Sequence, residues 1–123
     1  LGTVSFLDGT VEKIADGVLH IAGMVPIISE DPGGYETGDP VRMAIRPEKI
    51  TLSAARHGAV NEIPVTVEDL AFTGVATNYR VIGPDGLRLK LTQPNRRASD
   101  PVLEWEQQGF ASFDPADVVL LRD

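Results

Sequence analysis

Apolar and polar residues alternate along most of this chain, and this period of two constrains its fold more than any other feature. In the segments VRMAIR (41–46) and LRLKLT (87–92), every second residue is apolar, which places the apolar side chains on one face of a strand. No window of eleven or more residues has the apolar spacing of an amphipathic helix without a proline or glycine in it. At most one short helical turn is expected, at DPADV (114–118), where aspartate precedes proline. The sequence therefore predicts an all-β protein.

Turn residues divide this pattern into short strands. The 12 glycines and 9 prolines separate strand candidates at intervals of about 8–12 residues, which is typical of a small β-barrel or sandwich. Two hairpins are predicted: Asp16-Gly17 supplies the positive φ angles of the first turn, and Gly86 takes the left-handed position after Pro84 in the second. We expect further strands over residues 3–7, 49–53, 64–72, 102–106 and 118–122.

One expected strand contains an irregularity. The alternation in segment 64–72 slips at Asp69, because Leu70 and Phe72 have the opposite parity to the valines before them. A β-bulge near Glu68 and Asp69 would bring both apolar sets to the core. The prediction is therefore a bulged strand with Leu70 and Phe72 inside.

Composition limits the class of protein. A chain of 123 residues, of which 42% are hydrophobic, suits one domain over residues 1–123 with its own core. The absence of cysteine excludes disulfides, thiol nucleophiles and thiolate metal sites. A formal charge of −7 argues against nucleic acid or anionic lipid as the main partner, since both require a positive surface. The chain also begins with Leu1 at the edge of a strand pattern, so we expect a segment of a longer protein.

Motifs of catalysis were sought and not found. The sequence has no Gly-x-Ser-x-Gly element and no glycine followed by lysine, so it contains no phosphate-binding loop of the Gly-Lys-Ser/Thr type. His20 and His57 lack the spacing of metal ligands, and Glu104 and Glu106 have no apolar pocket around them that would tune an acid–base pair. The chain is therefore predicted to be no enzyme, with no catalytic, cofactor-binding or metal-binding residues of its own.

Four segments carry a resemblance to a known family. They are FLDGTV (6–11), GDPVRMAIRPEKITL (38–52), VEDLAFTGVATNYRVIGPDGLRLKL (67–91) and VLEWEQQGFASFDPADVVLL (102–121). In this order they resemble the C-terminal regulatory domain, the OB-like TOBE domain, of ATP-binding subunits of bacterial ABC importers. The Phe-x-Gly and Tyr-x-Val steps in the third segment resemble the polyamine (spermidine/putrescine) branch. One departure is the Asp100-Pro101 step before the tryptophan, where the family usually has glycine.

The resemblance implies both a fold and a role. The fold would be a small OB-like β-barrel with short hairpins. The domain would hold two copies of the subunit together and receive regulatory signals, while an N-terminal ATPase domain, absent from this sequence, binds ATP and Mg²⁺ and contacts the membrane subunits of the importer. Such a subunit would be cytoplasmic and peripheral on the inner face of the cell membrane.

The residues that we single out have structural rather than ligand-binding roles. Pro47 restricts Arg46 to extended geometry and ends a strand, so Arg46 and Glu48 flank a bend that a charge-assisted bond between them could hold. Trp105 is expected in a strand, on the core face beside Leu103. The predicted structural motif consists of Arg46, Pro47, Glu48, Gly74, Tyr79 and Trp105.

Two other function classes remain open at this point. A small-ligand or oxyanion-binding β module is one, because related barrels bind molybdate. It would need backbone amides with serine or lysine at a subunit junction. An OB-type nucleic-acid binder is the other, and it would need aromatic residues with basic residues between them on one face. Lysines are sparse, and only Arg96-Arg97 forms a local basic cluster. Both alternatives therefore rank below the regulatory domain.

Overall fold

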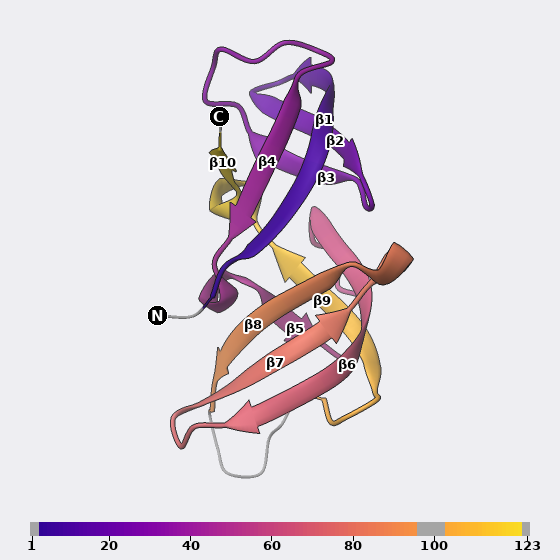
Figure 1. The fold of residues 1–123 in the computed structure, drawn as a ribbon, viewed down its shortest axis with the longest axis vertical. Helices are drawn as coiled ribbons and strands as arrows, with labels where there is room; N and C mark the ends of the chain where they lie inside the picture. Colours follow the sequence, from indigo (N-terminus) through magenta and orange to yellow (C-terminus); the bar gives the residue numbers. More distant parts are fainter. Residues whose placement is uncertain (1–2, 96–102, 122–123) are drawn as a thin grey trace.

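The computed structural model describes residues 3–95 and 103–121, and these form two antiparallel five-stranded sheets (Figure 1). The first sheet lies in the upper half of Figure 1 and contains both the first and the last strand. Its order is β10 (Val119–Leu121), β4 (Pro40–Ile45), β1 (Ser5–Ala15), β2 (Val18–Gly23) and β3 (Ile27–Glu30).

The second sheet is curled and lies in the lower half of the molecule (Figure 1). Its order is β5 (Thr51–Ser53), β9 (Gln108–Phe113), β6 (Asn61–Phe72), β7 (Ala76–Ile82) and β8 (Arg88–Pro94). The Leu52 N–H donates to Gln93 Oε1 at 2.6 Å, so a side chain joins the two edge strands. The predicted all-β, OB-like fold is confirmed.

The predicted hairpins are confirmed in detail. Strands β1 and β2 meet at Asp16 and Gly17, whose φ angles of 54° and 78° lie in the left-handed region. Strands β7 and β8 meet through Pro84–Gly86, where Gly86 has a φ of 77°. The alternating segments also point as expected, because all six predicted inward residues are buried: Val41, Met43, Ile45, Leu87, Leu89 and Leu91.

The predicted β-bulge is present, but its consequence for Phe72 is not. The pairing of β6 with β7 shifts register between Val67 and Asp69, which leaves Glu68 as the extra residue. Leu70 packs against the core, whereas Phe72 is 62% exposed because it lies at the far end of the hairpin, beyond the core. The prediction that Phe72 returns to the core was therefore wrong.

The described part of the chain contains three short 3₁₀ turns, whereas at most one helical turn was expected. They are η1 (Pro47–Lys49), η2 (Pro84–Gly86) and η3 (Pro115–Asp117), and each begins at a proline. The expected turn is η3, and the Ala116 N–H donates to its N-cap Asp114 Oδ1 at 2.9 Å. Proline supplies the φ angle of a first helical position without losing a hydrogen bond, which explains all three starts.

Two buried polar side chains join the sheets. The Ile28 N–H donates to Asn61 Oδ1 and Asn61 Nδ2 donates to the Ile28 carbonyl, both at 2.8 Å. The Asn61 amide thereby pairs with edge strand β3 as a neighbouring strand would. At the other side of the seam, the Lys90 N–H donates to Ser5 Oγ at 2.9 Å. The strand edges at the seam are thus satisfied by side chains of the other sheet.

Candidate functional site

The Arg46-Pro47-Glu48 element forms the bend that the sequence predicts. Arg46 is extended, with φ −72° and ψ 138°, and Pro47 is buried at the start of η1. Backbone bonds hold the bend: the Lys49 N–H donates to the Arg46 carbonyl at 3.0 Å. Arg46 and Glu48 are exposed, and the described ion pairs do not include one between them. The element therefore restrains the backbone through Pro47 and backbone hydrogen bonds, without the expected bond between the side chains of Arg46 and Glu48.

Tyr79 and Gly74 belong to the β6–β7 hairpin but lie at different depths. Tyr79 is fully buried, and its hydroxyl donates to the Leu103 carbonyl at 3.1 Å. This bond holds the segment after residue 102 against the second sheet. Gly74 lies in the exposed turn with a φ of 83°, a conformation that glycine adopts without strain. Both residues therefore have structural roles.

The prediction for Trp105 was wrong. Trp105 lies in a turn rather than a strand, and it is 68% exposed. The turn is closed by the Gln107 N–H, which donates to the Glu104 carbonyl at 3.1 Å, and Glu106 has a φ of 65°. Because the chain turns between Glu104 and Gln107, Trp105 is not part of a strand in which it would share the inward orientation of Leu103. Val102 and the preceding Asp100-Pro101 step lie outside the described residues.

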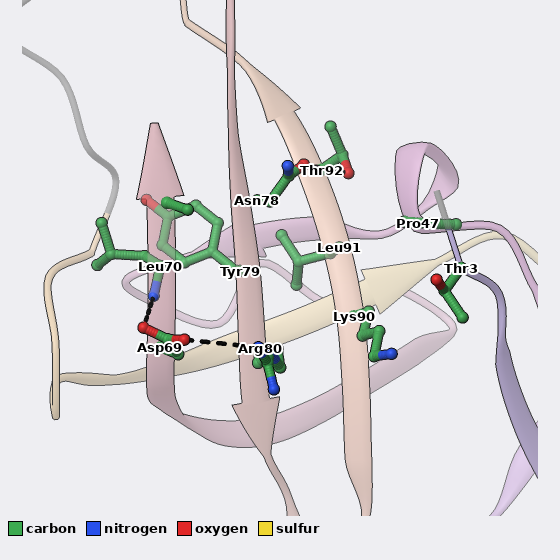
Figure 2. A pocket seen from close by; sticks show the side chains of 11 residues that line it. Thr3, Pro47, Asp69, Leu70, Asn78, Tyr79, Arg80, Lys90, Leu91 and Thr92 are labelled. Carbon is green, nitrogen blue, oxygen red and sulfur yellow. Dashed lines mark hydrogen bonds and ion pairs between the residues drawn. The ribbon is translucent and has the colours of Figure 1, made fainter. Parts of the chain in front are cut away.

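A polar hollow of about 460 Å³ lies against β6, β7 and β8 of the second sheet (Figure 2). Asp69 Oδ2 lies 3.7 Å from Arg80 Nη2, and Thr92 Oγ1 donates to Asn78 Oδ1 at 2.8 Å. Lys90 is the other basic residue of the lining, on the strand next to Arg80. Because the carboxylate partly neutralises Arg80, this hollow is a weak cradle for an anion.

The two histidines lie in different elements. His20 lies in β2, and His57 lies in the loop before β6 beside Glu62. Glu62 accepts a hydrogen bond of 2.9 Å from the His57 N–H, and this bond is the main reason that the pKa of Glu62 lies below its ordinary value, with the nearby charges of His57 and Arg56 acting in the same direction. Within residues 3–95 and 103–121, no three histidine, cysteine or acidic side chains are grouped to hold a metal ion.

The architecture defines a class of protein, a small OB-like β module whose two sheets are joined by hydrogen bonds of buried polar side chains. The comparison with family models identifies the family. Residues 43–121 match the TOBE domain model, and this range covers more than half of the chain. The chain belongs to the TOBE domain family, as the resemblance of its sequence segments indicated.

Two relatives are similar in sequence, and both are called spermidine/putrescine import ATP-binding protein PotA. The protein from Rubrobacter xylanophilus is 31% identical over 79% of this chain, and the one from Fusobacterium nucleatum is 25% identical over 99%. This chain covers only 26% and 36% of their respective lengths. Among solved structures, the cytoplasmic molybdate-binding protein ModG, with molybdate bound, matches 94% of this chain at a TM-score of 0.78 and 14% identity. That likeness shows the fold alone.

Proposed function

We propose that this chain is the regulatory domain of the ATP-binding subunit of an ABC importer, and that the importer carries polyamines such as spermidine and putrescine. The observation that supports this proposal most is the TOBE family match over residues 43–121 together with two relatives that carry the PotA name. The importer role is supported by the family, and the polyamine substrate is supported only by the names of those relatives.

In this proposal the chain does no chemistry itself. ATP and Mg²⁺ bind to an ATPase domain elsewhere in the subunit, and that domain contacts the membrane subunits. The seam formed by Asn61 and Ser5 would let the TOBE domain move as one rigid body while the ATPase domains open and close. The subunit works in the cytoplasm on the inner face of the cell membrane. Within the described residues, no helix is long and apolar enough to cross a bilayer.

The test uses the complete subunit. We expect the gene to encode a phosphate-binding loop about two hundred residues before this domain. Deleting the domain should lower the uptake of labelled spermidine by cells while the subunit still binds ATP. Uptake of an unrelated substrate by another importer is the control. A gene without the phosphate-binding loop, or uptake of spermidine unaffected by the deletion, would contradict the proposal.

The hollow beside Arg80 and Lys90 favours a second candidate, an oxyanion-binding module. Basic side chains in a hollow attract oxyanions, and the ModG structure with the same fold holds molybdate. We rank this candidate second because Asp69 lies beside Arg80. Calorimetry of the chain with molybdate decides it: micromolar binding that Arg80→Ala abolishes would favour the oxyanion module.

A further inference from the structure

A short loop lies over the outer face of the second sheet. Residues 54–60 connect β5 to β6, and most of them are exposed. The His57 N–H donates to Glu62 Oε2 at 2.9 Å, so the first turn of the chain into β6 reaches back to the loop. Among the described residues, the backbone–backbone hydrogen bonds outside the strands include none from residues 54–60. The hold on this loop, which we call the 54–60 strap, therefore depends on side chains and above all on one carboxylate.

The Glu62 carboxylate receives two side chains of the strap on separate oxygens. Arg56 Nη1 lies 3.5 Å from Oε1, and His57 Nδ1 lies 3.4 Å from Oε2. The Glu62 side chain is only 5% exposed, whereas those of Arg56 and His57 are more than half exposed. Arg56 and His57 thus lie on the water side of a carboxylate that they cover. Because each uses its own oxygen, a charge on His57 adds to the contact of Arg56 rather than replacing it.

Arg56 also attaches the strap to an aromatic ring of the sheet. Its guanidinium lies over the ring of Phe110 on β9, 4.6 Å from the ring centre. Phe110 pairs with Pro64 on β6, and the residues on either side of Pro64 and the residue after Phe110 are buried, so both side chains point outward. A cation over an aromatic face is attracted to it. The strap therefore joins the Glu62 carboxylate to the cover of Phe110.

We propose that the 54–60 strap is a pH-sensitive cover of the second sheet, which closes more tightly when His57 gains a proton. Histidine is the side chain whose charge ordinarily changes between about pH 5 and 8. The pKa of Glu62 lies below its ordinary value of 4.5, chiefly because of the bond from the His57 N–H, so its carboxylate stays ionised over most of this range. As the pH falls, His57 thus gains a positive charge beside an anion that is already present. This inference goes beyond the importer role and does not rest on it.

The other charged groups around the strap keep their charge near neutral pH. The neighbours of Glu62 in its row across the sheet are the uncharged Ser112 of β9 and Thr51 of β5. A hollow of about 310 Å³ lies beside the end of the strap, and its charged lining residues are Lys49, Asp114 and Asp117. Lysine, arginine and aspartate ordinarily do not change charge between about pH 6 and 8. Of the described groups that face the strap, His57 is therefore the one that responds in this range.

Hydrogen exchange of the His57 amide tests this proposal, because that N–H is protected while the strap is closed on Glu62. Exchange of the ¹⁵N-labelled chain is measured by NMR at about pH 6 and about pH 8, on either side of the ordinary histidine value, and each rate is divided by the intrinsic rate at that pH. We expect about two- to fivefold stronger protection at the lower pH, as one ion pair near the surface provides. The Gly33 and Ala116 amides, which donate to Asp31 and Asp114, are controls with equal protection at both values.

Three variants assign the response to its residues. His57→Gln should make the protection of amide 57 equal at both pH values, whereas His20→Gln, at the other histidine of the chain, should leave the pH dependence unchanged. Arg56→Gln should weaken the protection at both values and keep its pH dependence, because Arg56 and His57 contact different oxygens. Circular dichroism of every variant checks that the fold is retained. Equal protection at both values in the original chain, a dependence that survives His57→Gln, or one that His20→Gln removes would overturn the proposal.

Discussion

The two sheets have the same number of strands but differ in the side chains that three of their strands turn outward. On the second sheet, outward side chains form polar pairs, such as Asp69 with Arg80 and Thr92 with Asn78. On the first sheet, the corresponding positions across three strands hold Phe6, Ala44 and Val119. Since both sheets already bury a full apolar face in the core, the difference has no role in forming the fold. It teaches that the outward positions of β1, β4 and β10 carry an apolar row, whereas those of β6, β7 and β8 carry polar pairs.

The largest expected effect separates inward from outward aromatic residues. Tyr79→Ala should lower the free energy of unfolding by about 3–5 kcal/mol, because it removes a fully buried ring and a hydrogen bond to Leu103. Phe6→Ala should cost less than about 1 kcal/mol, since most of its ring is in water. Urea denaturation measures both. Equal losses would mean that Phe6 belongs to the core and would remove the contrast between the two sheets.

The next effect concerns the seam between the sheets. Asn61→Ala should cost about 2–4 kcal/mol, because it leaves the N–H and the carbonyl of Ile28 without these partners in a partly buried place. We expect one cooperative transition at a lower urea concentration, since the sheets also share a continuous core. Far-UV circular dichroism and tyrosine fluorescence should give the same midpoint. Two separate transitions in the original chain would show that the sheets fold independently.

The carboxylate of Glu62, near the start of β6, should make the free energy of unfolding depend on pH in the acid range. The pKa of Glu62 is lowered in the folded chain below its ordinary value of 4.5, chiefly by the bond from the His57 N–H. Its carboxylate therefore stabilises the fold above pH 4.5, and this contribution is lost as the pH falls through the lowered value. Glu62→Gln should flatten the dependence of stability on pH in that acid range, measured by urea denaturation from pH 3 to 6 (about one and a half units on either side). An unchanged slope would contradict the bond between the His57 N–H and the Glu62 carboxylate.

The smallest effect is expected at Trp105, the exposed aromatic residue of the second sheet's border. Trp105→Ala should change the free energy of unfolding by less than about 0.5 kcal/mol, as exposed substitutions do. The emission of the original chain should resemble that of free tryptophan. A blue-shifted maximum would show that the indole is buried.

Alternation was sufficient to predict most of the fold. It identified the inward residues of 41–46 and 87–92, and the turn chemistry of Asp16-Gly17 fixed the first hairpin because few other residue pairs adopt those φ angles. It failed at Trp105 because two apolar residues spaced by two occur in a strand and also, by chance, in a turn. The deciding feature is the positive φ of Glu106, and no rule of residue preference predicts it for a glutamate.

Contacts between distant parts of the chain were less predictable than its strands. Phe6 stands beside Leu7 in the sequence, and only the register of β1 with β4 shows which of them faces outward. Asn61 likewise reads as a turn residue before a strand, because its bonding partner lies 33 positions away in the chain. Both features depend on which strands are neighbours in space, and that information is absent from local patterns.

Amide chemical shifts in solution test the contrast between the two sheets most directly. Spectra of the ¹⁵N-labelled chain are recorded in dilute and in concentrated solution, and the shifts of Phe6, Ala44 and Val119 are compared with those of Asn78 and Arg80. We expect concentration-dependent shifts on β1, β4 and β10 alone, since those strands carry the outward apolar row of Phe6, Ala44 and Val119. Shifts confined to β7, or equal shifts on both sheets, would contradict this contrast between the two outer surfaces.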